Sequence, residues 1–167
     1  MVVGQSLGSY TATLVCERVP ARLLVFLNAM VPKLGESPGE MWEATGLREA
    51  RAEQARGDGR DPDAPFDPVV EFLHDVPQDV VESGPPPPDQ ADKPFEEFPL
   101  ERWPNVPIRF IQGRDDRFSP IEYQRRVVHD RLGIELDELP GGHLLALSQP
   151  VALAELLDRY AGEFRTM

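Results

Sequence analysis

Cysteine, positive charge and long apolar runs are all scarce in this sequence. Cys16 is the only cysteine among 167 residues, so no disulfide can form within the chain, and this favours a cytoplasmic location. Lysine and arginine together number 17 against 29 acidic residues, and the net charge of −12 makes nucleic acid and anionic membranes poor partners. No stretch approaches the roughly 20 apolar residues that cross a bilayer, so we expect no membrane contact. No spacing of histidine, cysteine and carboxylate residues predicts a metal site.

The first 31 residues predict a strand, a helix and a second strand, in a chain long enough for one domain with a hydrophobic core. An apolar run ends at Gly4, and the spacing of apolar residues predicts a helix over residues 9–19 that Pro20 stops. Cys16 falls in this helix, where a buried, inert thiol is expected rather than a reactive one. Residues 23–27 form a continuous apolar run, typical of a strand buried on both faces of a parallel sheet.

Residues 32–104 differ in character, because glycine, proline and charged residues dominate them. Helices are expected over residues 41–56 and 69–74, and the four prolines after Gly84 predict a stiff break. A structureless loop of this length is uncommon inside a compact domain. We therefore expect residues 32–104 to form an inserted cap over a binding site, and a partly disordered linker is the alternative.

Residues 105–167 return to alternating strands and helices. Strands are expected over residues 106–112 and 134–139, the second of them nearer the edge of the sheet, and helices over residues 121–132 and 151–164. Together with residues 1–31, these segments predict an α/β fold in which helices flank a mostly parallel sheet.

Three reactive residue types follow successive predicted strands. Ser6 lies in Gly4-Gln5-Ser6-Leu7-Gly8, the G-x-S-x-G pattern of a tight turn between a strand and a helix, and a Cβ on either glycine is expected to collide there. The pair Asp115-Asp116 follows residues 106–112, and His143 follows residues 134–139. The carboxyl ends of parallel strands share one crevice, so these side chains are expected to meet there. A serine nucleophile needs a base, and the base needs a carboxylate to orient it.

Taken together, these motifs resemble the C-terminal part of an α/β-hydrolase fold protein of the serine-nucleophile type. The segment from Gly113 to Pro120 resembles the acid loop of that family, and its spacing selects Asp116 over Asp115 as the acid. Gly142-His143 resembles the histidine loop. The resemblance implies that Ser6, Asp116 and His143 form a catalytic triad, with the backbone N–H of Leu7 in the oxyanion hole and no cofactor.

For several other residues the sequence gives less support for a functional role. His129 lies in a predicted amphipathic helix and is expected at the surface. His74 and Asp75 are expected to face the substrate, the solvent or the interior of the cap. The region also contains four aromatic residues that could either line an apolar acyl pocket or pack inside the cap, namely Trp42, Phe66, Phe72 and Trp103.

The resemblance also implies that four strands and part of a fifth precede Met1 in the family. We therefore expect this chain to be a truncated fragment, or half of a complex with a complementing N-terminal segment or an oligomeric partner. A loop that supplies a second oxyanion donor would be missing, and losing one such donor costs about 10²–10³ in rate. The strand at residues 23–27 would also border open backbone. Expressed alone, the chain is expected to be poorly soluble and nearly inactive.

The expected function is hydrolysis of a small ester or related carbonyl compound through an acyl-enzyme. A serine at the turn argues against the relatives that use aspartate there, the dehalogenases and epoxide hydrolases. Carbon–carbon hydrolases, lyases and cofactor-free haloperoxidases share the triad, so the fold alone does not choose the reaction. The alternative from another class is a non-catalytic protein that binds a partner through its open sheet edge.

Overall fold

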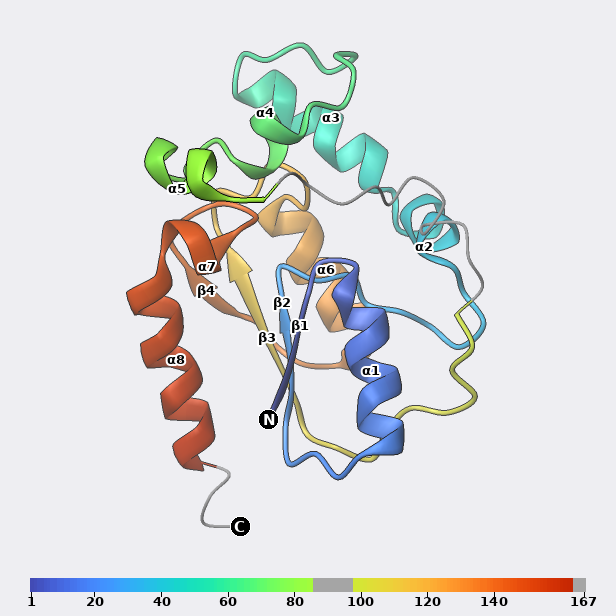
Figure 1. The fold of residues 1–167 in the computed structure, drawn as a ribbon. Coiled ribbons are helices and arrows are strands. Elements are labelled where there is room, and N and C mark those ends of the chain that lie inside the picture. Colours follow the sequence, from blue (N-terminus) through green and yellow to red (C-terminus); the bar gives the residue numbers. More distant parts are fainter. Residues whose placement is uncertain (86–97, 164–167) are drawn as a thin grey trace.

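The structure is a computed structural model that describes residues 1–85 and 98–163 (Figure 1). The predicted polyproline break extends into residues 86–88, and the last predicted helix ends at residue 164; both positions lie outside the described residues. Within those residues the sheet has four parallel strands in the order β1-β2-β3-β4. The strands are β1 (Val2–Gln5), β2 (Leu24–Leu27), β3 (Ile108–Gly113) and β4 (Asp137–Leu139).

Helices cover both faces of this sheet, as predicted. The helix α1 (Gly8–Arg18) and the helix α6 (Ile121–Leu132) lie on one face, and α8 (Pro150–Glu163) lies on the other (Figure 1). The apolar side chains of β2 alternate between them: Leu24 and Phe26 pack with α1 and α6, and Val25 packs with α8. All residues of β2 are buried, which explains its continuous apolar sequence.

The helices between β2 and β3 lie beyond the carboxyl ends of the strands (Figure 1). We refer to residues 32–104 as the insertion. The predicted single helix over residues 41–56 is wrong, because Gly46 adopts a left-handed conformation (φ 72°) that ends one helix and starts the next. Ser37 and Glu40 cap the first of these helices reciprocally. The insertion contains α2 (Pro38–Thr45), α3 (Leu47–Gly57), α4 (Pro68–Phe72) and α5 (Gln78–Ser83), and a short α7 (Leu145–Ser148) precedes α8.

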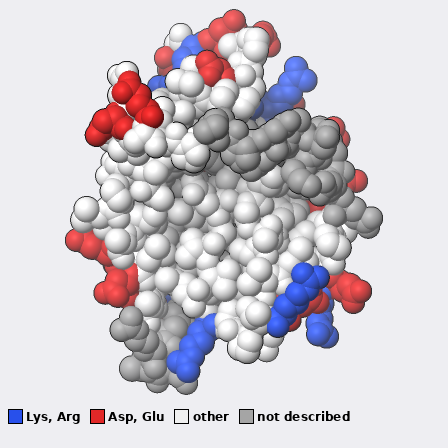
Figure 2. All heavy atoms as spheres, viewed as in Figure 1, with Lys and Arg blue, Asp and Glu red and all other residues white. Residues whose placement is uncertain are grey.

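Within the described residues β1 and β4 are the two edge strands of the sheet, so the expectation that residues 23–27 border unpaired backbone is wrong. β2 pairs with β1 on one side and with β3 on the other. On the face shown in Figure 2, charged side chains lie mainly around the rim, and the centre, over β1 and α1, carries almost none. Four apolar side chains in and next to these two elements are substantially exposed, namely Met1, Val3, Val15 and Val19.

None of the helices in residues 1–85 and 98–163 is both long enough and apolar enough to cross a membrane.

Candidate active site

Ser6 occupies the turn between β1 and α1 in a strained backbone conformation. Its φ of 51° lies in the left-handed region, which a residue with a Cβ rarely adopts. Gly4 allows the turn to close, because a Cβ there would lie 2.6 Å from the Cβ of Ala12. The expected collision at Gly8 is wrong, since nothing lies within 4 Å of a Cβ at that position. The turn therefore requires one of the two glycines of the motif for steric reasons.

His143 lies within hydrogen-bond distance of both other predicted triad residues. Its Nε2 is 3.0 Å from Oγ of Ser6, and its Nδ1 is 2.9 Å from Oδ2 of Asp116. An ionised carboxylate only accepts hydrogen bonds, so Nδ1 carries the proton and the neutral imidazole presents Nε2 as an acceptor to the serine hydroxyl. The ring is 2% exposed, which shields this arrangement from water.

Asp116 is fully buried and fully hydrogen-bonded. Its Oδ1 accepts the backbone N–H groups of Phe118 and Ser119 at 2.9 and 3.0 Å. Burial alone would raise the pKa of the Asp116 carboxyl, but the imidazole of His143 and the hydrogen-bond donors around the carboxylate hold that pKa below its usual value. The group therefore remains ionised and can stabilise a positive charge on the imidazole.

Two amide side chains that the sequence analysis missed complete the environment of Asp116. Asn28 Nδ2 donates to Oδ2 of Asp116 at 2.8 Å, and Gln112 Nε2 donates to the same atom at 3.0 Å. Asn28 directly follows β2 and Gln112 is the penultimate residue of β3, so both lie at the carboxyl ends of strands. A polar residue at the end of an apolar run was the only signal in the sequence that pointed to them.

Side chains from other elements also form hydrogen bonds with the backbone of the loop that carries His143. Gln5 Nε2 donates to the carbonyl oxygen of His143 at 3.1 Å, and Asn28 Nδ2 donates to that of Gly142 at 3.2 Å. Asp115, the carboxylate that the spacing did not select, accepts the N–H of Gly141 at 2.9 Å. The two neighbouring aspartates thus serve different parts of one site: Asp116 binds the imidazole and Asp115 binds the loop.

A cavity of about 870 Å³ opens at Ser6, and its wall combines aromatic and aliphatic side chains with charged residues of α2 and α3. Three of the four aromatic residues considered from the sequence, Trp42, Phe66 and Phe72, line it. Trp103 instead packs against Phe26, with ring centroids 6.5 Å apart. The insertion therefore provides much of the wall of the cavity that reaches the serine.

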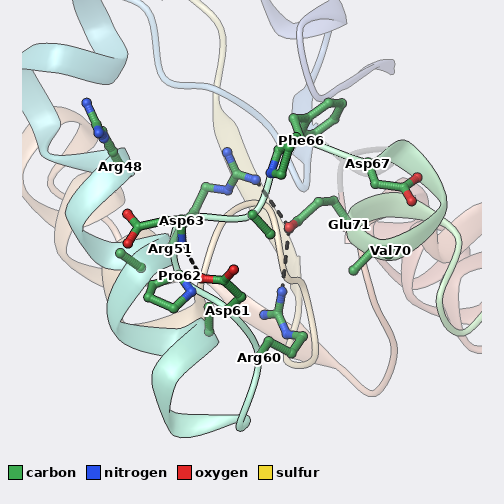
Figure 3. A pocket seen from close by; sticks show the side chains of 14 residues that line it. Arg48, Arg51, Arg60, Asp61, Pro62, Asp63, Phe66, Asp67, Val70 and Glu71 are labelled. Carbon is green, nitrogen blue, oxygen red and sulfur yellow. Dashed lines mark hydrogen bonds and ion pairs between the residues drawn. The ribbon is translucent and has the colours of Figure 1, made fainter.

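A second cavity, of about 650 Å³, shares Arg48, Arg51 and Phe66 with the first (Figure 3). Glu71 points into it between two arginines and lies 3.3 Å from Arg51 and 3.5 Å from Arg60. None of Ser6, Asp116 and His143 lines this cavity. Of these two cavities, the first is the one that Ser6 lines.

The remaining candidates lie away from the serine. His129 is exposed, as predicted, and its Nδ1 lies 3.4 Å from Asp130. Cys16 is a half-buried free thiol whose pKa is raised by burial, which disfavours the reactive thiolate. The described residues contain no group of three or more histidine, cysteine and carboxylate side chains placed to hold a metal ion.

Solved structures of several hydrolases share this architecture. A pyrethroid hydrolase from Sphingobium faniae JZ-2 is 22% identical to the chain, with a TM-score of 0.65, and the match covers 96% of this chain and 69% of that one. A polyneuridine aldehyde esterase is 19% identical with a TM-score of 0.68, covering 95% of this chain and 70% of that one. A methylesterase from Arabidopsis is 18% identical with a TM-score of 0.67, and the match covers 96% of this chain and 68% of that one.

No curated protein matches the chain significantly. A family model described as the alpha/beta hydrolase family matches residues 1–156, which include Ser6, Asp116 and His143. The predicted resemblance and the predicted fold class are thereby confirmed. The chain belongs to the alpha/beta hydrolase family.

Proposed function

We propose that this chain is a serine hydrolase that cleaves apolar carboxylic esters through an acyl-enzyme. The observation that carries the proposal is the continuous hydrogen-bonded path from Ser6 Oγ through the imidazole of His143 to the carboxylate of Asp116. Because a free serine hydroxyl is barely nucleophilic at neutral pH, a positioned base is the feature that this chemistry requires.

In the proposed reaction, Ser6 Oγ attacks the ester carbonyl carbon while Nε2 of His143 takes the hydroxyl proton. The resulting tetrahedral intermediate expels the alcohol, which receives that proton, and leaves an acyl group on Ser6. Water then attacks the acyl carbonyl while His143 takes a proton from it. The bond between the acyl carbon and Ser6 Oγ breaks, Ser6 Oγ receives that proton, and the carboxylic acid is released. Asp116 stabilises the imidazolium in both steps without taking its proton.

The backbone N–H of Leu7 is the proposed donor to the oxyanion. Leu7 directly precedes the first residue of α1 and lines the cavity next to Ser6. Backbone N–H groups at the start of a helix have no intrahelical acceptor, and the helix dipole favours negative charge there. The developing oxyanion would therefore lie beside a group that is already oriented toward it.

The proposed substrate class follows from the lining of the cavity. Its volume of about 870 Å³ exceeds what a short acyl chain fills, and aromatic and aliphatic side chains dominate its walls. The names of the similar structures, a pyrethroid hydrolase and two esterases, agree with ester cleavage. We propose an ester with a bulky apolar acyl or alcohol group, and we propose that residues 32–104 act as the cap that encloses it.

A second candidate function, binding of a partner at the sheet edge, is favoured by one specific observation. The outer edge of β1 is open within the described residues, and the surface around it is apolar and nearly uncharged (Figure 2). Such an edge can accept a further strand by backbone hydrogen bonding. We propose that this edge pairs with a strand from another polypeptide segment, and this pairing is compatible with catalysis.

Labelling with a fluorophosphonate tests the catalytic proposal, because the probe reacts only with an activated serine. The proposal predicts one covalent label at Ser6 that is lost in His143→Ala. Folded protein that resists the probe would leave edge binding as the better-supported function.

A further inference from the structure

The carboxylate of Asp75 in the insertion contacts the loop that carries the catalytic histidine. Asp75 Oδ2 accepts the backbone N–H of Gly142 at 2.6 Å, and Gly142 immediately precedes His143. This short hydrogen bond fixes the peptide next to the imidazole. The sequence left open whether Asp75 faces the substrate, the solvent or the interior, and the structure places it against this loop.

Gly142 fits so closely against this part of the insertion that no side chain could replace its hydrogen. A Cβ at Gly142 would lie 2.7 Å from Asp75 Oδ1 and 2.7 Å from Nε2 of His74. Both of these atoms are buried and without a hydrogen-bond partner among the described residues. The loop and the insertion are therefore packed in direct contact.

The same short segment of the insertion also contacts the imidazole itself. The ring of Phe72 stacks on that of His143, with centroids 4.5 Å apart and planes at 22°. Phe72 additionally lines the cavity at Ser6, whereas Asp75 does not. Residues 72–75 thus hold the histidine from two directions, by stacking on the ring and by hydrogen bonding to the backbone.

The other backbone contacts of this loop come from the core of the fold. Gln5, Asn28 and Asp115 contact it from the ends of β1, β2 and β3. Asp75 adds a contact from a segment that precedes β3 in the chain and that forms the wall of the cavity. The position of the base is therefore coupled to the insertion as well as to the sheet.

We infer that Asp75 is a positioning residue that holds the loop of His143, so that Nε2 of the imidazole faces Ser6. This inference rests on the proposed serine-hydrolase function. A displacement of about 1 Å in a catalytic group can lower the rate about 100-fold, so loss of a single anchor is expected to lower kcat. The KM is expected to change little, because Asp75 does not line the substrate cavity.

The test compares three variants of one acidic segment with p-nitrophenyl butyrate as substrate. Asp75→Ala removes the acceptor, and Asp75→Asn keeps an acceptor oxygen while removing the charge. Asp79→Ala removes a nearby exposed carboxylate of α5 and serves as the matched control. We expect kcat to fall about 10- to 100-fold in Asp75→Ala with an unchanged KM. We expect recovery to within a few-fold in Asp75→Asn and wild-type values in Asp79→Ala.

Hydrogen–deuterium exchange of the Gly142 amide provides a readout that does not depend on activity. We expect faster exchange in Asp75→Ala and near wild-type exchange in Asp75→Asn. If Asp75→Ala does not fold, Asp75→Ser replaces it, because the shorter side chain cannot span the same distance. Wild-type kcat in a folded Asp75→Ala or Asp75→Ser protein would overturn the inference, as would an equal loss in Asp79→Ala. Absence of turnover and of fluorophosphonate labelling in the wild type would instead overturn the proposed function.

Discussion

The side-chain amide of Asn28 donates a hydrogen bond to Oδ2 of Asp116 across 88 residues of sequence. Asn28 is buried and holds a left-handed backbone conformation, with φ of 43°, which asparagine tolerates better than most residues. The same Nδ2 also contacts the carbonyl oxygen of Gly142. One amide group therefore links the end of β2 to both the acid and the loop of the base.

Replacing Asn28 by alanine is expected to weaken both the fold and the reaction. The change removes a buried donor from an ionised carboxylate, which costs about 1–3 kcal/mol in the free energy of unfolding. Urea denaturation measures this loss, and ester hydrolysis is expected to slow in parallel because Asp116 loses an anchor. Asn105→Ala at an exposed position is the control and is expected to change neither quantity. Wild-type stability in Asn28→Ala would contradict the assigned role.

Acidification is expected to remove the stabilisation that the ionised Asp116 provides. The folded-state pKa of this carboxyl lies below its unfolded value of about 3.9, so its contribution is complete above that value and is lost as the pH falls through the folded pKa. Asp116→Asn cannot ionise. The difference in Tm between the wild type and Asp116→Asn, measured from pH 7 to pH 2, is therefore expected to shrink toward low pH. A difference that stays constant over this range would contradict the prediction.

Phe66 is expected to contribute to the selection of large substrates. It is half-exposed and lines the cavity at Ser6, so its removal enlarges that cavity with little effect on the core. In Phe66→Ala we expect kcat/KM for p-nitrophenyl octanoate to fall about 10-fold relative to p-nitrophenyl acetate. Val69→Ala is the control, because Val69 is exposed on α4 and lines neither cavity. Equal losses for the two esters would contradict a role in substrate selection.

The open edge of β1 is expected to promote association of the protein. Val3 is 41% exposed on this strand, and a lysine at an edge position discourages pairing with another strand. Val3→Lys is therefore expected to remain monomeric at concentrations where the wild type associates, as sedimentation velocity would show. Val151→Lys places the same charge on an exposed valine of α8 and is expected to behave as the wild type. Loss of association in both variants would show that net charge, rather than the edge, controls association, and association of Val3→Lys at the wild-type level would contradict a role of the edge.

The meeting of Ser6, Asp116 and His143 could be anticipated from the sequence, because each residue follows a predicted strand within a recognisable local pattern. The parallel sheet with helices on both faces followed from the apolar runs in the same way, whereas the order of its strands was not predicted. Asn28 and Gln112 could not be identified, because an amide at the end of a strand has no characteristic spacing. Their function depends on contacts with a distant loop, which only the folded chain reveals.

The errors in the sequence analysis have local physical causes. The apolar pattern continues through Gly46, so periodicity alone joined α2 and α3 into one helix, although the left-handed glycine separates them. Gly8 was expected to be sterically necessary because it belongs to the motif, but the structure leaves open space there. The contact between Asp75 and Gly142 was not predicted at all, because it joins the insertion to a loop 67 residues away.

The proposed triad is tested most directly by the rate at which a fluorophosphonate modifies residue 6 in the wild type, in Ser6→Ala and in His143→Ala, with the site identified by peptide mass spectrometry. We expect a single modification at Ser6 in the wild type and none at this position in either variant. Labelling of Ser6 that persists at the wild-type rate in His143→Ala would show that the imidazole does not activate the serine. That result would contradict the proposed role of His143 as the base.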